Sequence, residues 1–167
     1  MNFCKEFVHM RQHVILMMVI CSSVIIACAG SQSGGTGTKT DDMQITSGRM
    51  QDIAGIEWHL LSMKTNGQTV SLIKDTKNTF SCDENGKVAG MATINRYFGS
   101  FRFRKDGEII WDKAFGMTRM AGPPELMDQE AEFMQALPLT SRIYMTKGKL
   151  VLISNDKTTL LEFGKVK

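Results

Sequence analysis

The stretch that decides the fold is "GMTRMAGPPELMDQEAEF", residues 116–133. Its second half departs from the two-residue alternation found in much of the remaining domain. Apolar side chains there recur at intervals of three and four residues, which predicts an amphipathic helix over residues 124–137. The predicted apolar stripe consists of Met127, Ala131, Met134 and Leu137, with Leu126 and Phe133 beside it.

Both ends of this helix are marked in the sequence. Pro124 suits a first helical turn, because its missing N–H would have no partner there, and Pro138 prevents continuation. The polar side chains of Asp128, Glu132 and Gln135 fall opposite the apolar stripe, so we expect them to face solvent. Solvation alone accounts for these polar residues, which favours a scaffold over a binding site.

The rest of the domain consists of short segments with alternating apolar residues, separated by turn residues. This pattern predicts a small antiparallel β protein, with hairpin turns where asparagine, aspartate or lysine precedes glycine. We therefore expect an α+β fold: a mainly antiparallel curved sheet or partial barrel with one amphipathic helix near residues 124–137. The predicted strands are residues 58–63, 69–73, 79–82, 87–93, 109–111 and 158–163, with further strands within 100–104 and 142–154.

Residues 1–27 have the features of an export signal. Lys5 and Arg11 precede "VILMMVICSSVIIA", residues 14–27, an uncharged apolar run too short for a membrane span of about 20 residues. The run leads into Cys28 in a pattern that resembles the lipobox of bacterial lipoproteins. We predict a lipoprotein signal peptide over residues 1–27 and a lipid anchor on Cys28. The alternative is an uncleaved anchor or a non-lipidated signal, with Cys28 as an incidental thiol.

The segment after Cys28 is rich in Gly, Ser and Thr and has too little apolar surface to fold. We assign residues 28–49 to a flexible tether and residues 50–167 to a single domain of ordinary size. Ala29, rather than aspartate, follows the cysteine. In a Gram-negative cell this implies export to the outer membrane, with the domain in the periplasm.

Charge and residue counts exclude several classes of function. The full chain has 20 basic and 17 acidic residues; Lys5, Arg11 and Glu6 leave with the signal, so the mature chain is only weakly basic. That balance argues against a nucleic-acid partner. Cys82 and His59 are the one thiol and the one imidazole after the anchor, which excludes a disulfide within the domain and a usual zinc site. We expect both to be structural or surface residues, and we expect no cofactor.

Several segments resemble the META domain family, which includes HslJ-like bacterial lipoproteins. Besides residues 116–133, the matching pieces occur in the expected order and span nearly the whole domain. They are "GIEWHL" (55–60), "GMATINRYFGSF" (90–101), "IYMTKGKLVL" (143–152) and "LLEF" (160–163). The resemblance implies a mainly antiparallel sheet with one helix, a location in the cell envelope and a loose connection with stress tolerance. It implies no catalytic residues.

The sequence departs from the family pattern at two positions. Relatives often carry one cysteine just before the Asn-Arg step and another after "TRM", where this chain has Ile94 and Gly122. Both are missing together, as expected if they work as a pair in relatives. The resemblance therefore implies that a disulfide or paired-thiol role is lost here while the fold is kept.

These observations favour a non-enzymatic envelope lipoprotein that binds another envelope protein or supports envelope integrity under stress. Candidate contact residues lie in two motif loops: Asn95, Arg96 and Tyr97 in one, and Thr118 and Arg119 in the other. The alternative is structural, with Asn95 and Thr118 tying loops to backbone groups and Arg119 in an ion pair.

Binding of a small ligand or metal is the alternative function. Met117 and Met120 have a spacing that thioether ligands of Cu(I) could use, although methionine is also a common core residue. An apolar cavity in the sheet could hold a lipid-like molecule instead. An enzyme is disfavoured, because the acidic residues fall in turns and on the predicted solvent face of the helix.

Overall fold

A computed structural model describes residues 42–113 and 115–165 of the chain. The predicted signal peptide, the Cys28 anchor and residues 28–41 of the predicted tether lie outside the described residues. Within the described part, no helix is both long enough and apolar enough to cross a bilayer.

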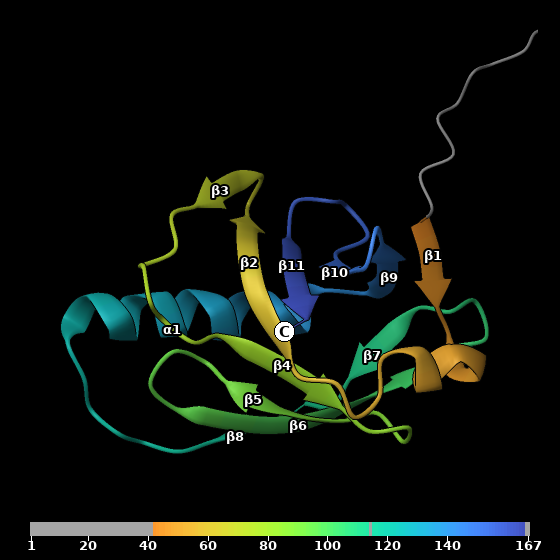
Figure 1. The fold of residues 1–167 in the computed structure, drawn as a ribbon, viewed down its shortest axis with the longest axis horizontal. Helices are drawn as coiled ribbons and strands as arrows, with labels where there is room; N and C mark the ends of the chain where they lie inside the picture. Colours follow the sequence, from red (N-terminus) through yellow and green to blue (C-terminus); the bar gives the residue numbers. More distant parts are fainter. Residues whose placement is uncertain (1–41, 114, 166–167) are drawn as a thin grey trace, which may run out of the picture. The chain divides into compact units, whose positions relative to one another are not determined.

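The domain is an 11-stranded antiparallel sheet with one helix, which confirms the predicted α+β class (Figure 1). Nine strands follow the order β1-β9-β10-β11-β2-β4-β5-β6-β7, while β3 pairs with β2 and β8 pairs with β6. The sheet is curved but not closed. The elements are β1 (Asp42–Ile45), a 3₁₀ helix (Ser47–Asp52), β2 (Trp58–Thr65), β3 (Gln68–Val70), β4 (Thr79–Cys82), β5 (Lys87–Met91), β6 (Arg96–Phe103), β7 (Ile109–Trp111), β8 (Gly116–Met117), α1 (Pro124–Ala136), a second 3₁₀ turn (Leu137–Leu139), β9 (Arg142–Thr146), β10 (Lys149–Ile153) and β11 (Leu160–Lys165).

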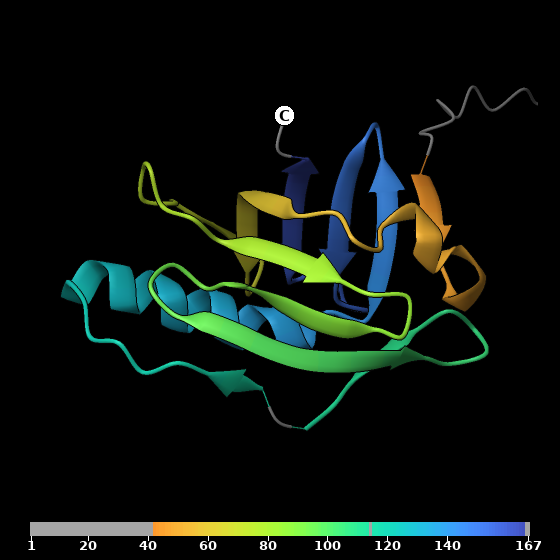
Figure 2. The same ribbon diagram turned by 60° about the horizontal axis from the view of Figure 1, so that its bottom comes forward.

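The helix α1 lies alongside the sheet, next to strands β6 and β11 (Figures 1 and 2). Phe133 is fully buried, and its ring contacts Tyr97 of β6 and Phe163 of β11 in edge-on arrangements. Together with Trp58 and Phe80, these rings form the centre of one hydrophobic core. The helix therefore packs against β6 and β11, which are separated in the strand order by β2, β4 and β5.

The buried face of α1 differs from the predicted stripe. Ala131 is exposed, whereas Gln129 and Glu130 are almost completely buried. Phe133 lies four and three residues after these two, so all three share one helix face. The prediction for Ala131 was wrong because two polar residues occupy the core side of the helix. Asp128, Glu132 and Gln135 are exposed, as predicted.

The N-terminal boundary also differs from the prediction. Residues 42–49, which we assigned to the tether, contain β1 and the start of the 3₁₀ helix. β1 pairs with β9 from Asp42↔Thr146 to Ile45↔Ile143, and Ile45 is fully buried. The folded domain therefore includes residues before Met50.

Candidate functional site

The two motif loops meet at the side chain of Asn95, which is buried. Its Oδ1 accepts hydrogen bonds from the Thr118 hydroxyl at 2.8 Å and from the Met120 N–H at 2.7 Å. Thr118 Oγ1 in turn accepts a bond from the Arg96 N–H at 3.0 Å. Asn95 and Thr118 thus connect the two loops to each other, and their polar atoms are occupied within the fold.

Glu130 of α1 binds the first motif loop through its side-chain carboxylate, at Ile94 and Asn95. Its Oε2 accepts hydrogen bonds from the backbone N–H groups of Ile94 at 3.0 Å and Asn95 at 2.7 Å, and its Oε1 accepts one from Asn95 Nδ2 at 2.7 Å. The sequence does not mark Glu130 as a site residue, because glutamate on a helix is usually solvated. The available signal was its position three residues before Phe133.

Gln129 makes a second buried network beside Glu130. Its Oε1 accepts the Ile73 N–H at 2.6 Å, and its Nε2 donates to Thr76, Asn78 and Thr93 at 3.0 to 3.2 Å. Thr93 has φ 114°, an unusual value for a β-branched residue. The bond to its hydroxyl fixes the Thr93 side chain against the helix, two residues before Asn95.

Tyr97 is a core residue, not a surface contact. Only 1% of it is exposed, and its hydroxyl donates to the Thr79 carbonyl at 2.8 Å. Burial is the main cause that raises the pKa of Tyr97 far above its usual value, with Cys82 adding to the shift. Sequence analysis placed Tyr97 among the candidate contacts; the structure corrects this, because alternate residues of a strand point to opposite faces.

The remaining candidate residues lie on the surface along the edge formed by β8 and the loop after it. Arg96 and Arg119 are exposed, and within residues 42–113 and 115–165 neither has a carboxylate within 4.0 Å. The structure therefore gives no support to an ion pair of Arg119. Three large apolar side chains are also exposed nearby: Phe98 on β6, Met117 on β8 and Met120 in the loop after β8. We define the β8 edge by five exposed residues from β6, β8 and the loop after β8: Arg96, Phe98, Met117, Arg119 and Met120. Met117 is paired with Tyr97, so it lies on the opposite face of this edge from Arg96 and Phe98.

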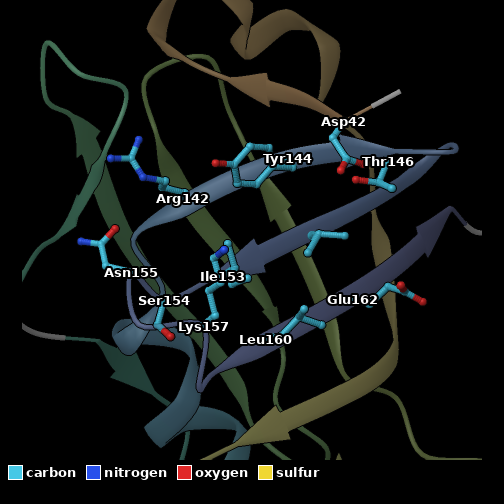
Figure 3. A pocket seen from close by; sticks show the side chains of 11 residues that line it. Asp42, Arg142, Tyr144, Thr146, Ile153, Ser154, Asn155, Lys157, Leu160 and Glu162 are labelled. Carbon is cyan, nitrogen blue, oxygen red and sulfur yellow. The ribbon is translucent and has the colours of Figure 1, made fainter. Parts of the chain in front are cut away.

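A separate groove lies on the outer face of β9, β10 and β11 (Figure 3). Its volume is about 570 Å³. The half-buried side chains of Tyr144, Val151, Ile153 and Leu160 line it between charged residues from both ends of the strands. This volume is within the range of about 300–1,000 Å³ that is common for small-molecule sites.

Comparison with protein families gives one decisive match. The model of the META domain matches residues 51–167, which is well over half of the chain. The chain belongs to the META domain family. A comparison with curated protein sequences gives no match.

Solved structures share the fold of this META domain. An NMR structure of a protein from Burkholderia xenovorans has 20% identity and a TM-score of 0.58, over 73% of this chain and 89% of that one. A second NMR structure has 22% identity and a TM-score of 0.50, over 72% and 94%. A crystal structure of a DUF4847 family protein from Bacteroides vulgatus has 14% identity and a TM-score of 0.51, over 68% and 94%. Because the match covers most of each solved chain, this fold exists without a further domain.

The two positions where META relatives often carry cysteine lie against each other. A Cβ atom placed on Gly122 would be only 2.0 Å from Cδ1 of Ile94, so the isoleucine side chain occupies the space that a second side chain would need. Ile94 therefore packs against Gly122 at the place where the resemblance to the META family implies a pair of cysteines in relatives.

The other titratable candidates of this META domain have structural or surface positions. Cys82 is buried, and burial, with Asp83 adding to it, raises the pKa of the thiol from 9.0 to about 12. His59 Nε2 lies 3.0 Å from a carboxylate oxygen of Glu57 near the surface. Within residues 42–113 and 115–165, no group of three or more His, Cys, Asp or Glu side chains is placed to hold a metal ion.

Proposed function

We propose that this chain is a lipid-anchored envelope protein whose META domain binds another envelope protein without catalysing a reaction. The observation that carries the proposal is the β8 edge. Phe98 is 60% exposed, Met117 40% and Met120 53%, and the two arginines beside them are exposed.

The composition of the β8 edge supports a protein contact. Aromatic residues, methionine and arginine are enriched in protein–protein interfaces relative to other surfaces. The same elements offer little for catalysis, because the polar side chains of Asn95, Thr118 and Glu130 are engaged in the hydrogen bonds that connect the loops. The motif loops thus hold exposed side chains in position, which suits recognition.

The sequence supports attachment to the outer membrane. The lipobox-like residues before Cys28 and the Ala29 that follows it are the grounds for this part of the proposal. It is tested by metabolic labelling with an alkyne fatty acid. We expect the label on the mature protein and its complete loss in Cys28→Ala; equal label in both forms would exclude anchoring through this residue.

The protein contact is tested by site-specific photocrosslinking in intact cells. A photoreactive phenylalanine analogue replaces Phe98 in one variant and Leu139 in a matched control, because Leu139 is 58% exposed but lies outside the β8 edge. We expect a discrete crosslinked band from position 98 only. Adding Arg119→Ala should weaken this band without changing the melting temperature. Equal crosslinking from both positions, or none from position 98, would contradict the proposed contact.

A further inference from the structure

We propose that the groove on β9, β10 and β11 binds a short apolar peptide with free ends, lying extended across the sheet face. This site is distinct from the β8 edge, and the inference does not depend on the lipid anchor. Two features of the groove carry it: an apolar floor, and side chains of opposite charge without an ion-pair partner among the described residues, Lys157 at one end and Asp42 at the other.

The strand register places the floor side chains next to one another. Tyr144 is opposite Val151, and Ile153 is opposite both Arg142 on β9 and Leu160 on β11. Residues directly opposite in an antiparallel pair point to the same face, so these side chains form one continuous surface. In Figure 3 the side chains of Tyr144, Ile153 and Leu160 lie between Arg142 and Asn155 on one side and Asp42 and Glu162 on the other. This apolar floor favours a ligand whose middle part, between its charged ends, is apolar.

The end of the groove near the turn after β10 has two cations in its lining, and three carboxylates lie beside them: Asp106, Asp156 and Glu108, the last bonded to Asn155 Nδ2 at 2.5 Å. Lys157 and Arg142 line it together with Asn155. Arg142 donates to the Asp106 carbonyl at 3.3 Å, and its Nη2 lies 3.9 Å from the Asp106 carboxylate, so this guanidinium is partly engaged. Lys157 has no carboxylate within 4.0 Å among the described residues. Its ammonium is therefore the main candidate for binding a carboxylate of a ligand.

The opposite end is acidic. Asp42 of β1 pairs with Thr146 of β9, and both line the groove. Glu162 also lines it, with one oxygen bonded to Lys149 Nζ at 2.8 Å. Asp42 has no such cation within 4.0 Å in the described part of the chain. This end suits an ammonium group.

The backbone at Lys157 decides which substitution tests its side chain. Lys157 closes the turn from Ser154 with φ 62°, a left-handed conformation that costs a non-glycine residue free energy. Glycine would fill this position without strain. Replacing Lys157 with glycine therefore removes the ammonium without straining the turn, which makes this substitution a clean test of the side chain.

The distance between the two ends selects the ligand. Arg142 and Thr146 are the first and last residues of β9, and a strand rises about 3.3 Å per residue, so the backbone of the groove floor is roughly 13 Å long between them. An extended peptide of three or four residues has the same length, with a carboxylate at one end and an ammonium at the other. A fatty acid would match only the floor and the Lys157 end.

The test is NMR titration of the ¹⁵N-labelled segment 29–167, since the solved relatives show that this fold stands alone. The probes are the peptide Ala-Leu-Leu-Ala, its N-acetylated and C-amidated forms, and decanoate. We expect shifts of the Val151, Ile153 and Leu160 amides with the free peptide. Each blocked end should weaken binding by about five-fold, as for the loss of one exposed ion pair.

Two glycine substitutions separate binding from folding. Lys157→Gly should weaken peptide binding by about five-fold while the melting temperature stays equal or rises. Lys147→Gly is the matched control, because Lys147 also has a positive φ of 50° but does not line the groove. It should leave binding unchanged. The proposal is overturned if the free peptide causes no shifts at the groove, if blocked peptides bind equally well, if decanoate displaces the peptide, or if both variants bind alike.

Discussion

Replacing Glu130 with alanine should strongly destabilise the domain. The carboxylate is almost fully buried and accepts three hydrogen bonds, two from backbone N–H groups and one from Asn95 Nδ2. The Asn95 amide nitrogen also donates to the Met120 carbonyl at 3.1 Å, so it retains one partner in the variant. The N–H groups of Ile94 and Asn95 lose the acceptor that Glu130 provides.

The magnitude follows from these two donors. A buried donor left without a partner costs about 1–3 kcal/mol, so Glu130→Ala should lower the free energy of unfolding by about 2–6 kcal/mol. Glu130→Gln should cost less, about 1–3 kcal/mol, because one amide oxygen can still accept both backbone bonds. Its NH₂ group then faces the NH₂ group of Asn95, and two donors cannot bond to each other.

Urea unfolding followed by tryptophan fluorescence measures these changes, since Trp58 is buried and Trp111 is half-buried in the core. Glu132→Ala is the matched control: the same residue type on the same helix, but exposed. It should change the free energy of unfolding by no more than about 0.5 kcal/mol. If Glu130→Ala were as stable as Glu132→Ala, the assignment of Glu130 as the support of the first motif loop would be wrong.

Three further predictions concern sulfur chemistry. The raised pKa of Cys82 keeps its thiol protonated at pH 8, so alkylation by iodoacetamide should be very slow in the folded protein and fast in urea. The unfolded thiol ionises near pH 9.0 and the folded thiol near 12, so the contribution of Cys82 to stability should be lost as the pH rises through this window. The double variant Ile94→Cys, Gly122→Cys should form a disulfide, detected by mass spectrometry without reductant, and stabilise the domain by about 2–4 kcal/mol relative to its reduced form; two free thiols after oxidation would argue against the proximity of these positions. The double variant Met117→Leu, Met120→Leu should compete with a Cu(I) chelator no differently from the parent protein, whereas a loss of copper binding would favour the metal alternative.

Local turn chemistry allowed much of the sheet to be predicted from the sequence. The predicted strands 79–82 and 109–111 match β4 and β7, because aspartate, asparagine and glycine mark the neighbouring turns. β1 and β8 were missed. Both are short, four and two residues, and they are strands because of their pairing with β9 and β6, which no local pattern reports.

The contacts of the candidate site were predicted less well, because they also join residues that are far apart in the sequence. The loops around Asn95 and Thr118 were identified, and the structural alternative for these two residues describes their contacts. Their support by Glu130 was not foreseen, because the residues are far apart in sequence and a glutamate in an acidic helix suggests a solvated side chain. The groove involves residues from four strands that only the register brings together.

The strand order has a consequence for folding kinetics. β1 pairs with β9 and β2 pairs with β11, so each pairing joins residues roughly 100 positions apart. Such non-local contacts form slowly, because a large loop must close before they contribute stability. The central strands of the sheet cannot be completed until nearly the whole chain has emerged from the ribosome. The hairpins from β4 to β7 join residues that are close in sequence and can form earlier, but the complete sheet forms only after β11 has been synthesised.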